Sequence, residues 1–120
     1  MEKMLIFPKD FWWGSAWSAE QSEGTGDTGK AETIWEHWFN KEPNRFYDRI
    51  GPKVTTDHFY RYKDDIKLMK ETGHNSFRLS LSWARLFPDG GTGEINKKAV
   101  DFYRDLMSEM IKNGIKPFIK

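Results

Sequence analysis

The order of apolar patterns along the 120 residues is the feature that most constrains how this chain can fold. Short segments of alternating or continuous apolar character predict strands at residues 11–18, 75–83 and 115–119. A stretch with apolar residues at helical spacing separates each strand from the next. Strands that alternate with helices pair in parallel, through right-handed crossover connections. The sequence therefore predicts an α/β domain with about three parallel strands and two main helices.

The ends of the two main helices can be placed from the sequence. The first is expected to be capped by Thr55 or Thr56 and to end at Gly73, and the second to follow Asn96 and end at Gly114. Each helix carries one apolar stripe, which is expected to pack on the sheet. The stripes are Phe59, Tyr62, Ile66 and Met69 in the first helix and Ala99, Tyr103, Leu106 and Met110 in the second.

The predicted sheet has two open edges. A parallel sheet needs cover on both faces, and three strands with two helices cannot supply it. The apolar run of the last strand also reaches Lys120 without a turn or a helix after it. No linker or internal repeat divides the chain. We therefore expect residues 1–120 to be one incomplete domain, cut from a longer protein.

The composition excludes several classes of partner and cofactor. The 19 basic and 18 acidic residues are balanced, so no basic surface for nucleic acid is expected. No segment approaches the roughly 20 apolar residues of a membrane span, and none resembles a secretion signal. Cysteine is absent, and the three histidines form no metal-ligand pattern. We expect a cytoplasmic protein that binds no metal, cofactor, membrane or nucleic acid.

A glycine-rich loop at residues 24–30 matches the spacing G-x-G-x-x-G. It also approaches the phosphate-binding P-loop, but Ala31 stands where that loop requires a hydroxyl for magnesium. No compact strand leads into the loop, and the short helix expected at residues 33–39 does not begin directly at its end. A flexible polar loop is therefore the preferred interpretation.

Arg78 lies on the polar side of the second strand, with Ser80 and Ser82. If the apolar side meets the helices and the sheet curls into a barrel, the guanidinium points inward. A buried guanidinium is costly unless a carboxylate meets it. The three strands offer no such carboxylate, so the partner would come from a later strand. The alternative is an arginine that reaches solvent.

Gln21 and Glu23 follow the end of the first strand, where α/β barrels build their catalytic face. A glutamine amide both donates and accepts hydrogen bonds, which suits adjacent sugar hydroxyls. An ordinary polar loop residue is the alternative. The aromatic content of 16%, with six Trp, fits either a large-residue core or contacts with sugar rings.

Five blocks of the sequence resemble glycoside hydrolase family 1, the family of β-glucosidases and 6-phospho-β-glucosidases. They follow one another in the family's order and together span nearly the whole chain. The blocks are FWWGSAWSAEQSEG at 11–24, TIWE at 33–36, DHFYRYKDDIKLM at 57–69, FRLSLSWARLFPDG at 77–90 and GIKP at 114–117. Glu20 departs from the family's first block, in which Tyr, Phe, Asn or His is usual.

The resemblance implies that the chain is the N-terminal part of a TIM (β/α)8 barrel that is not closed. It implies a retaining mechanism with two catalytic Glu residues, which the family carries in later motifs absent from this chain. Glu42, before Pro43, lacks the context of the family's acid/base residue. The resemblance carries over two roles: Gln21 as a ligand of sugar hydroxyls, and Arg78 as the residue that orients the nucleophile.

These expectations leave three hypotheses open. The chain is part of a β-glycosidase that acts on β-glucosides or 6-phospho-β-glucosides and is inactive alone. The second hypothesis is that the chain is a non-catalytic sugar-binding or interaction module derived from the same barrel. A separate C-terminal barrel fragment is the third possibility, as a partner that supplies the missing strands.

Overall fold

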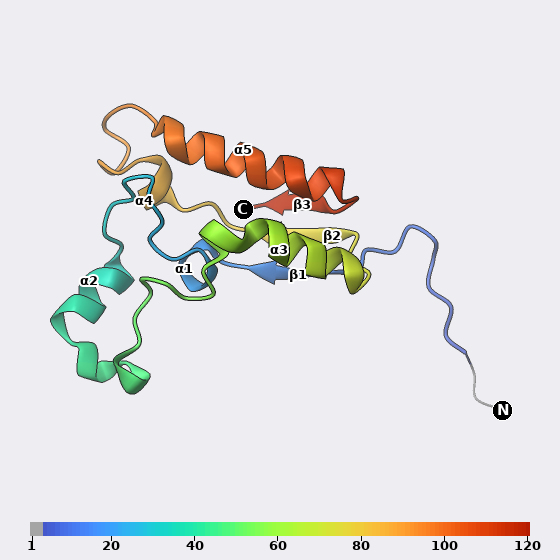
Figure 1. Cartoon of the computed structure of the whole chain (residues 1–120), viewed down its shortest axis with the longest axis horizontal. Helices are drawn as coiled ribbons and strands as arrows, with labels where there is room; N and C mark the ends of the chain where they lie inside the picture. Colours follow the sequence, from blue (N-terminus) through green and yellow to red (C-terminus); the bar gives the residue numbers. More distant parts are fainter. Residues whose placement is uncertain (1–3) are drawn as a thin grey trace.

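The computed structural model describes residues 4–120 and contains one sheet of three strands. The strands β1 (Gly14–Trp17), β2 (Ser76–Leu79) and β3 (Lys116–Ile119) are parallel and lie in the order β1-β2-β3 (Figure 1). The two long helices, α3 (His58–Glu71) and α5 (Lys97–Lys112), connect them and cover one face of the sheet. The predicted α/β architecture with an unclosed sheet is confirmed. No helix within the described residues is long and apolar enough to cross a membrane.

Five shorter helices lie in the connections. They are α1 (Ala19–Ser22), α2 (Ile34–Lys41), the 3-10 helices η1 (Pro43–Arg45) and η2 (Tyr47–Arg49), and α4 (Trp83–Leu86). The segment from α2 to η2 forms an excursion that projects away from the sheet (Figure 1). Its Thr33 and Glu36 form a complete capping box, which fixes the start of α2.

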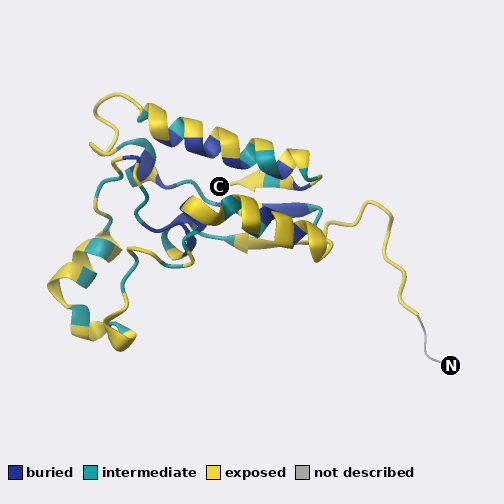
Figure 2. Ribbon diagram, in the orientation of Figure 1, coloured by how far each residue is buried: buried dark blue, intermediate teal, exposed yellow. Residues whose placement is uncertain are grey.

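A single hydrophobic core lies between the sheet and the two long helices. Phe77 and Leu79 of β2 point into it, as their alternation with Arg78 predicts. Ile66 of α3 and Leu106 of α5 are fully buried there. Figure 2 shows buried residues along the sides of α3 and α5 that face the sheet, and exposed residues on their outer sides. The two predicted apolar stripes therefore form the core.

The strands are shorter than the sequence pattern suggests. β1 begins at Gly14 and not at residue 11, and β2 ends at Leu79 and not at residue 83. The second difference has a local cause, because the Ser82 hydroxyl accepts a hydrogen bond from the Arg85 amide and caps α4. Trp83 therefore starts a helix and is exposed. Ser22 and its neighbours form α1, where the sequence suggested only a loop.

The structure confirms the predicted cap at the start of α5 and corrects the one at the start of α3. Asn96 caps α5 by accepting from the Ala99 amide, and Gly73 and Gly114 take positive φ angles directly after the two long helices. Neither expected threonine caps α3. Its N-cap residue is Asp57, and the Thr56 hydroxyl instead donates to the Ser22 carbonyl oxygen. Thr56 thus joins the start of α3 to α1.

His58 is buried beside β1, at the start of α3. Its Nδ1 lies 2.7 Å from an Asp65 carboxylate oxygen, and the ring packs edge-on against Trp17. Its Nε2 has no hydrogen-bond partner among the described residues. Burial lowers the pKa of His58 below its ordinary value of 6.5, because desolvation outweighs the attraction of Asp65. The folded state therefore favours the neutral ring.

The fold is expected to lose stability as the pH falls below about 6.5. His58 then binds a proton in the unfolded chain, but in the folded chain its lowered pKa keeps the ring neutral. The loss from this residue is at most about 1.4 kcal/mol per pH unit. Urea unfolding at pH 7.5 and 5.5 checks this, comparing the parent with His58→Gln. The variant should lose less stability than the parent over this interval. The control is His37→Gln, at an exposed histidine. An equal loss of stability in the parent and His58→Gln, or an equally reduced loss in His37→Gln, would contradict the assignment to His58.

Candidate functional site

The open face of the sheet carries Arg78, one of the two residues that the sequence assigned to a site. Ala16, Arg78 and Phe118 are in register across the three strands, on the face away from α3 and α5. Arg78 is exposed there, opposite the buried Phe77 and Leu79. Among the described residues, no carboxylate forms an ion pair with Arg78. Its side chain is therefore available to a group that this part of the chain does not supply.

Gln21 and Arg78 line the same open hollow. The hollow has a volume of about 460 Å³ and lies where β1 and β2 end. It is also lined by Ala16, Trp17, Ser18, Ser80 and Lys120. The carboxyl ends of parallel strands are where barrels of this class bind their ligands. The structure thus brings together two residues that are 57 positions apart in the sequence (78 − 21).

Short polar contacts hold Gln21 at the end of β1. The Ser18 hydroxyl caps α1 and donates to the Gln21 side-chain oxygen at 3.0 Å. The Ala19 amide donates to the Ser80 hydroxyl at 2.9 Å, which joins α1 to the segment after β2. Gln21 is itself exposed to the hollow. Its amide nitrogen remains free to meet a ligand hydroxyl, because the contact with Ser18 uses the oxygen.

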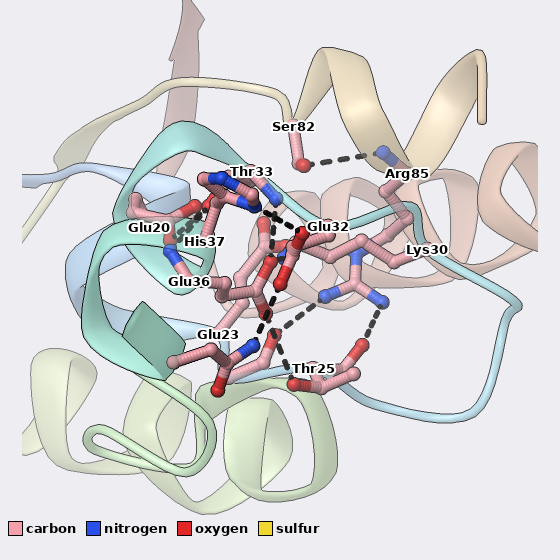
Figure 3. Close-up of polar contacts among 12 residues, drawn as sticks. Glu20, Glu23, Thr25, Lys30, Glu32, Thr33, Glu36, His37, Ser82 and Arg85 are labelled. Atoms are coloured by element: carbon pink, nitrogen blue, oxygen red, sulfur yellow. Dashed lines mark hydrogen bonds and ion pairs between the residues drawn. The ribbon is translucent and has the colours of Figure 1, made fainter. Parts of the chain in front are cut away.

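A buried ion pair that the sequence did not reveal anchors the loop behind Gln21. Arg85 of α4 is fully buried, and its Nε donates to a Glu23 carboxylate oxygen at 3.0 Å (Figure 3). The Tyr103 hydroxyl of α5 lies within 3.0 Å of both Glu23 carboxylate oxygens. The other Arg85 nitrogens donate to the carbonyl oxygens of Gly24 and Thr25 and to the Thr28 hydroxyl. The glycine-rich loop is therefore wrapped around one guanidinium.

The Glu23 carboxylate is a structural group and lies apart from the hollow. It is 3% exposed, and burial raises its pKa although Arg85 and Tyr103 both oppose the rise. Burial also raises the pKa of Tyr103, and the charge of Glu23 adds to that rise. The sequence contained one signal of this role. Arg85 is the single charged residue in the apolar run from Trp83 to Phe87, where an exposed cation is not expected.

A second polar cluster fixes the other end of the same loop. Lys30 forms a 2.6 Å ion pair with Glu36 of α2, and its side chain is only 4% exposed (Figure 3). Burial raises the pKa of Glu36, but hydrogen bonds from Lys30 and the Thr33 amide outweigh it, so the pKa is lowered overall. The Thr33 hydroxyl donates to Glu20 at 2.7 Å. Lys30 is thus engaged within the protein. Residues 24–30 form a polar loop, as expected, but Arg85 and Glu36 hold it in place, whereas the sequence suggested a flexible loop.

A larger apolar hollow adjoins the first. It has a volume of about 500 Å³ and shares Ser18 and Gln21 with the hollow at Arg78. Trp35 and Phe46 of the excursion provide its aromatic wall. The 4–120 segment holds no group of three His, Cys, Asp or Glu residues that could bind a metal ion. The site therefore combines one amide, one guanidinium, hydroxyls and aromatic surface.

Known proteins match this chain over almost all of its length. It is 60% identical over 114 residues to 6-phospho-beta-glucosidase GmuD of Bacillus subtilis, which covers 94% of the chain and 24% of GmuD. It is 47% identical over 116 residues to beta-glucosidase A of Acetivibrio thermocellus, which covers 96% of the chain and 25% of that enzyme. The chain thus spans about a quarter of the length of these relatives.

The backbone matches as well as the sequence. The crystal structure of the psychrophilic beta-glucosidase BglU from Micrococcus antarcticus superposes with a TM-score of 0.87 at 40% identity, over 96% of this chain and 24% of that one. The three strands and their helices are therefore arranged as in an enzyme with a (β/α)8 barrel. The sequence profile described as Glycosyl hydrolase family 1 matches residues 3–120. This chain belongs to glycosyl hydrolase family 1 and corresponds to the N-terminal portion of its barrel.

Proposed function

We propose that this chain forms part of the sugar site of a retaining β-glycosidase and has no hydrolytic activity alone. The observation that carries this proposal is the meeting of Gln21 and Arg78 at one hollow, at the ends of β1 and β2. The amide would bind sugar hydroxyls, and the guanidinium would orient a carboxylate nucleophile. Retaining hydrolysis needs two carboxyl groups about 5–5.5 Å apart. The hollow is lined by no carboxylate, so the nucleophile and the acid/base would come from other strands.

The substrate class follows from the relatives' names. GmuD is named a 6-phospho-beta-glucosidase, and the relative from Acetivibrio thermocellus is named a beta-glucosidase. We propose a β-glucoside or a 6-phospho-β-glucoside as the substrate, in carbohydrate metabolism. We also propose a cytoplasmic location; the absence of cysteine in this segment is compatible with it but sets no redox requirement of its own.

A hybrid enzyme tests the assignment of Gln21. In this hybrid, the chain replaces the aligned quarter of GmuD, and the hybrid should hydrolyse an aryl 6-phospho-β-glucoside. Gln21→Ala should lower kcat/KM about thirtyfold, because two sugar hydrogen bonds of about 1 kcal/mol each are lost. The matched control is Asp27→Asn on the exposed part of the loop, which should leave kcat/KM within about twofold. An unchanged kcat/KM in Gln21→Ala would refute the assignment.

The chain alone provides the second arm of this experiment. It should show no turnover of aryl β-glucosides or their 6-phosphates. Turnover that persists after the protein is shown to be free of host glycosidases would refute the inactive-alone proposal.

A sugar-binding module is the second candidate function. The observation that favours it is the aromatic wall of Trp35 and Phe46 beside Gln21. Sugar rings stack on such surfaces, and a tryptophan fluorescence titration of the chain with cellobiose would report binding. Saturable quenching that Gln21→Ala weakens would favour this candidate, and a flat titration would exclude it.

A further inference from the structure

The larger, apolar hollow beside Gln21 presents one negative charge to a ligand. Glu20 is the only charged residue among the described residues that line it. Glu20 is half-buried, and none of the ion pairs within residues 4–120 includes it. The hollow at Arg78, by contrast, is lined by no carboxylate. The two hollows that share Gln21 therefore differ in the charge that they present.

Glu20 is held in place by the start of α2. The Thr33 hydroxyl accepts a hydrogen bond from the Glu36 amide and donates its proton to a Glu20 carboxylate oxygen at 2.7 Å (Figure 3). No described residue donates to the other Glu20 oxygen. A carboxylate that is fixed through one oxygen can accept hydrogen bonds from a ligand with the other. Glu20 is therefore an oriented acceptor in the hollow.

The aromatic wall of the same hollow is fixed by packing. The Trp38 ring contacts both of the rings that form this wall, with centroids 5.9 Å from that of Trp35 and 4.9 Å from that of Phe46. Trp35 follows Thr33 by two residues, so the capping box that begins α2 also sets the position of this ring. The hollow thus combines a flat apolar surface with one carboxylate.

The chemistry of a retaining glycosidase directs the leaving group toward this hollow. The nucleophile attacks the anomeric carbon on the side opposite the leaving group. The proposed function places that nucleophile beside Arg78, so the leaving group lies on the side of the sugar away from Arg78. The larger hollow shares Ser18 and Gln21 with the hollow at Arg78 but is not lined by Arg78 itself. It is therefore the adjoining space that a leaving group would enter.

We propose that Glu20 is a specificity-determining residue that selects the leaving group of the substrate. Its free oxygen accepts hydrogen bonds from the hydroxyl groups of a neutral leaving group, such as a second sugar, that stacks on Trp35. The same carboxylate repels a leaving group that carries a negative charge. This assignment rests on the proposed function, because it requires a glycoside bound at Gln21 and Arg78.

A pair of matched substrates measures the repulsion in the hybrid of this chain with the rest of GmuD. Both are aryl 6-phospho-β-glucosides; the leaving group is 4-hydroxybenzoate in one and its neutral methyl ester in the other. Glu20→Gln removes the charge but keeps an acceptor oxygen for Thr33. It should raise kcat/KM for the benzoate relative to the ester about fivefold, because the like charge is gone. Glu20→Lys should raise this ratio further.

A second pair of substrates measures the hydrogen bonds to hydroxyl groups. They are cellobiose phosphorylated on the 6-hydroxyl of its non-reducing sugar and 4-nitrophenyl 6-phospho-β-glucoside. Glu20→Gln should lower kcat/KM for the disaccharide about fivefold relative to the aryl substrate, because a carboxylate accepts a stronger hydrogen bond than an amide. The control Glu94→Gln makes the same change at an exposed residue in a separate hollow along α5, and should leave both ratios within about twofold.

Each outcome decides one point. Unchanged ratios in Glu20→Gln, in a hybrid that hydrolyses the substrates, would overturn the role of Glu20 and leave the proposed function standing. An equal fall in kcat/KM for every substrate would also overturn it, because a purely structural residue does not distinguish leaving groups. A shift of both ratios in Glu94→Gln would show that the effect is not local to the hollow. A hybrid that hydrolyses none of the substrates would contradict the proposed function and, with it, the assignment of Glu20.

Discussion

Arg85→Met is expected to lower the free energy of unfolding by about 3–5 kcal/mol, or to prevent folding where the parent has less stability than that. Methionine retains much of the side-chain volume but leaves the Glu23 carboxylate buried without its counter-charge. It also leaves the carbonyl oxygens of Gly24 and Thr25 without their donor. Such groups are costly when they are unpaired and removed from water. Urea unfolding, followed by circular dichroism, measures the change.

Two further variants separate the stability lost by breaking the ion pair from the stability lost by removing any arginine. Arg61→Met removes an exposed arginine whose 3.6 Å contact with Asp57 lies on the surface of α3, and it should cost less than about 1 kcal/mol. In Arg85→Met with Glu23→Leu, the uncompensated charge is gone, and part of the lost stability should return. A loss below about 1 kcal/mol in Arg85→Met, or no recovery in the double variant, would contradict the role given to this pair.

Gly14→Ala is expected to destabilise the fold by about 3 kcal/mol, because β1 and β2 approach too closely for a side chain. A Cβ at position 14 would overlap the carbonyl oxygen and the hydroxyl of Ser76, its partner in the register. The carbonyl belongs to the backbone of β2, so the clash is relieved only if the strands separate. The loss should appear as a lower urea midpoint with an unchanged m-value.

A pair of controls isolates this contact. Ala16→Ser adds one atom on the same face of β1, at an exposed position that lines the open hollow, and should be nearly neutral. Gly14→Ala with Ser76→Ala removes the hydroxyl but leaves the carbonyl, so the double variant should recover only part of the stability. Full recovery would show that the hydroxyl alone causes the clash, and a neutral Gly14→Ala would show that the strands can separate at little cost.

The sequence predicted most of the elements because the relevant signals are local. The stripes through Ile66 and Leu106 repeat within a few residues, and Asn96 needs only the amide of Ala99 to cap its helix. Strand and loop lengths were less predictable. Ser82 caps α4 within what reads as an alternating strand, because a serine can serve either pattern. In the fold its amide also donates to the Tyr103 hydroxyl of α5.

The candidate site was predicted in part. Gln21 was singled out because it follows the first strand, and Arg78 because it lies on the polar side of the second strand; the structure places both at one hollow. The roles given to them come from the family resemblance and stay predictions. The ion pair of Arg85 with Glu23 was missed, although it holds the loop that follows Gln21. The two residues are 62 positions apart. The apolar neighbours of Arg85 hint that it is buried, but nothing local identifies Glu23 as its partner. Only the approach of α4 to the end of β1 removes both from water.

The sequence by itself therefore determined the family, the alternation of strands and helices, and the apolar faces that form the core. These follow from residue types at spacings of two to four, which the backbone geometry of strands and helices converts directly into faces. The tertiary structure alone decided which charged side chains are buried, which form ion pairs and which are exposed without an ion pair. In the cluster around Arg85 and Glu23, burial and pairing depend on residues 57 to 80 positions apart, and only the folded chain brings those residues within reach of one another.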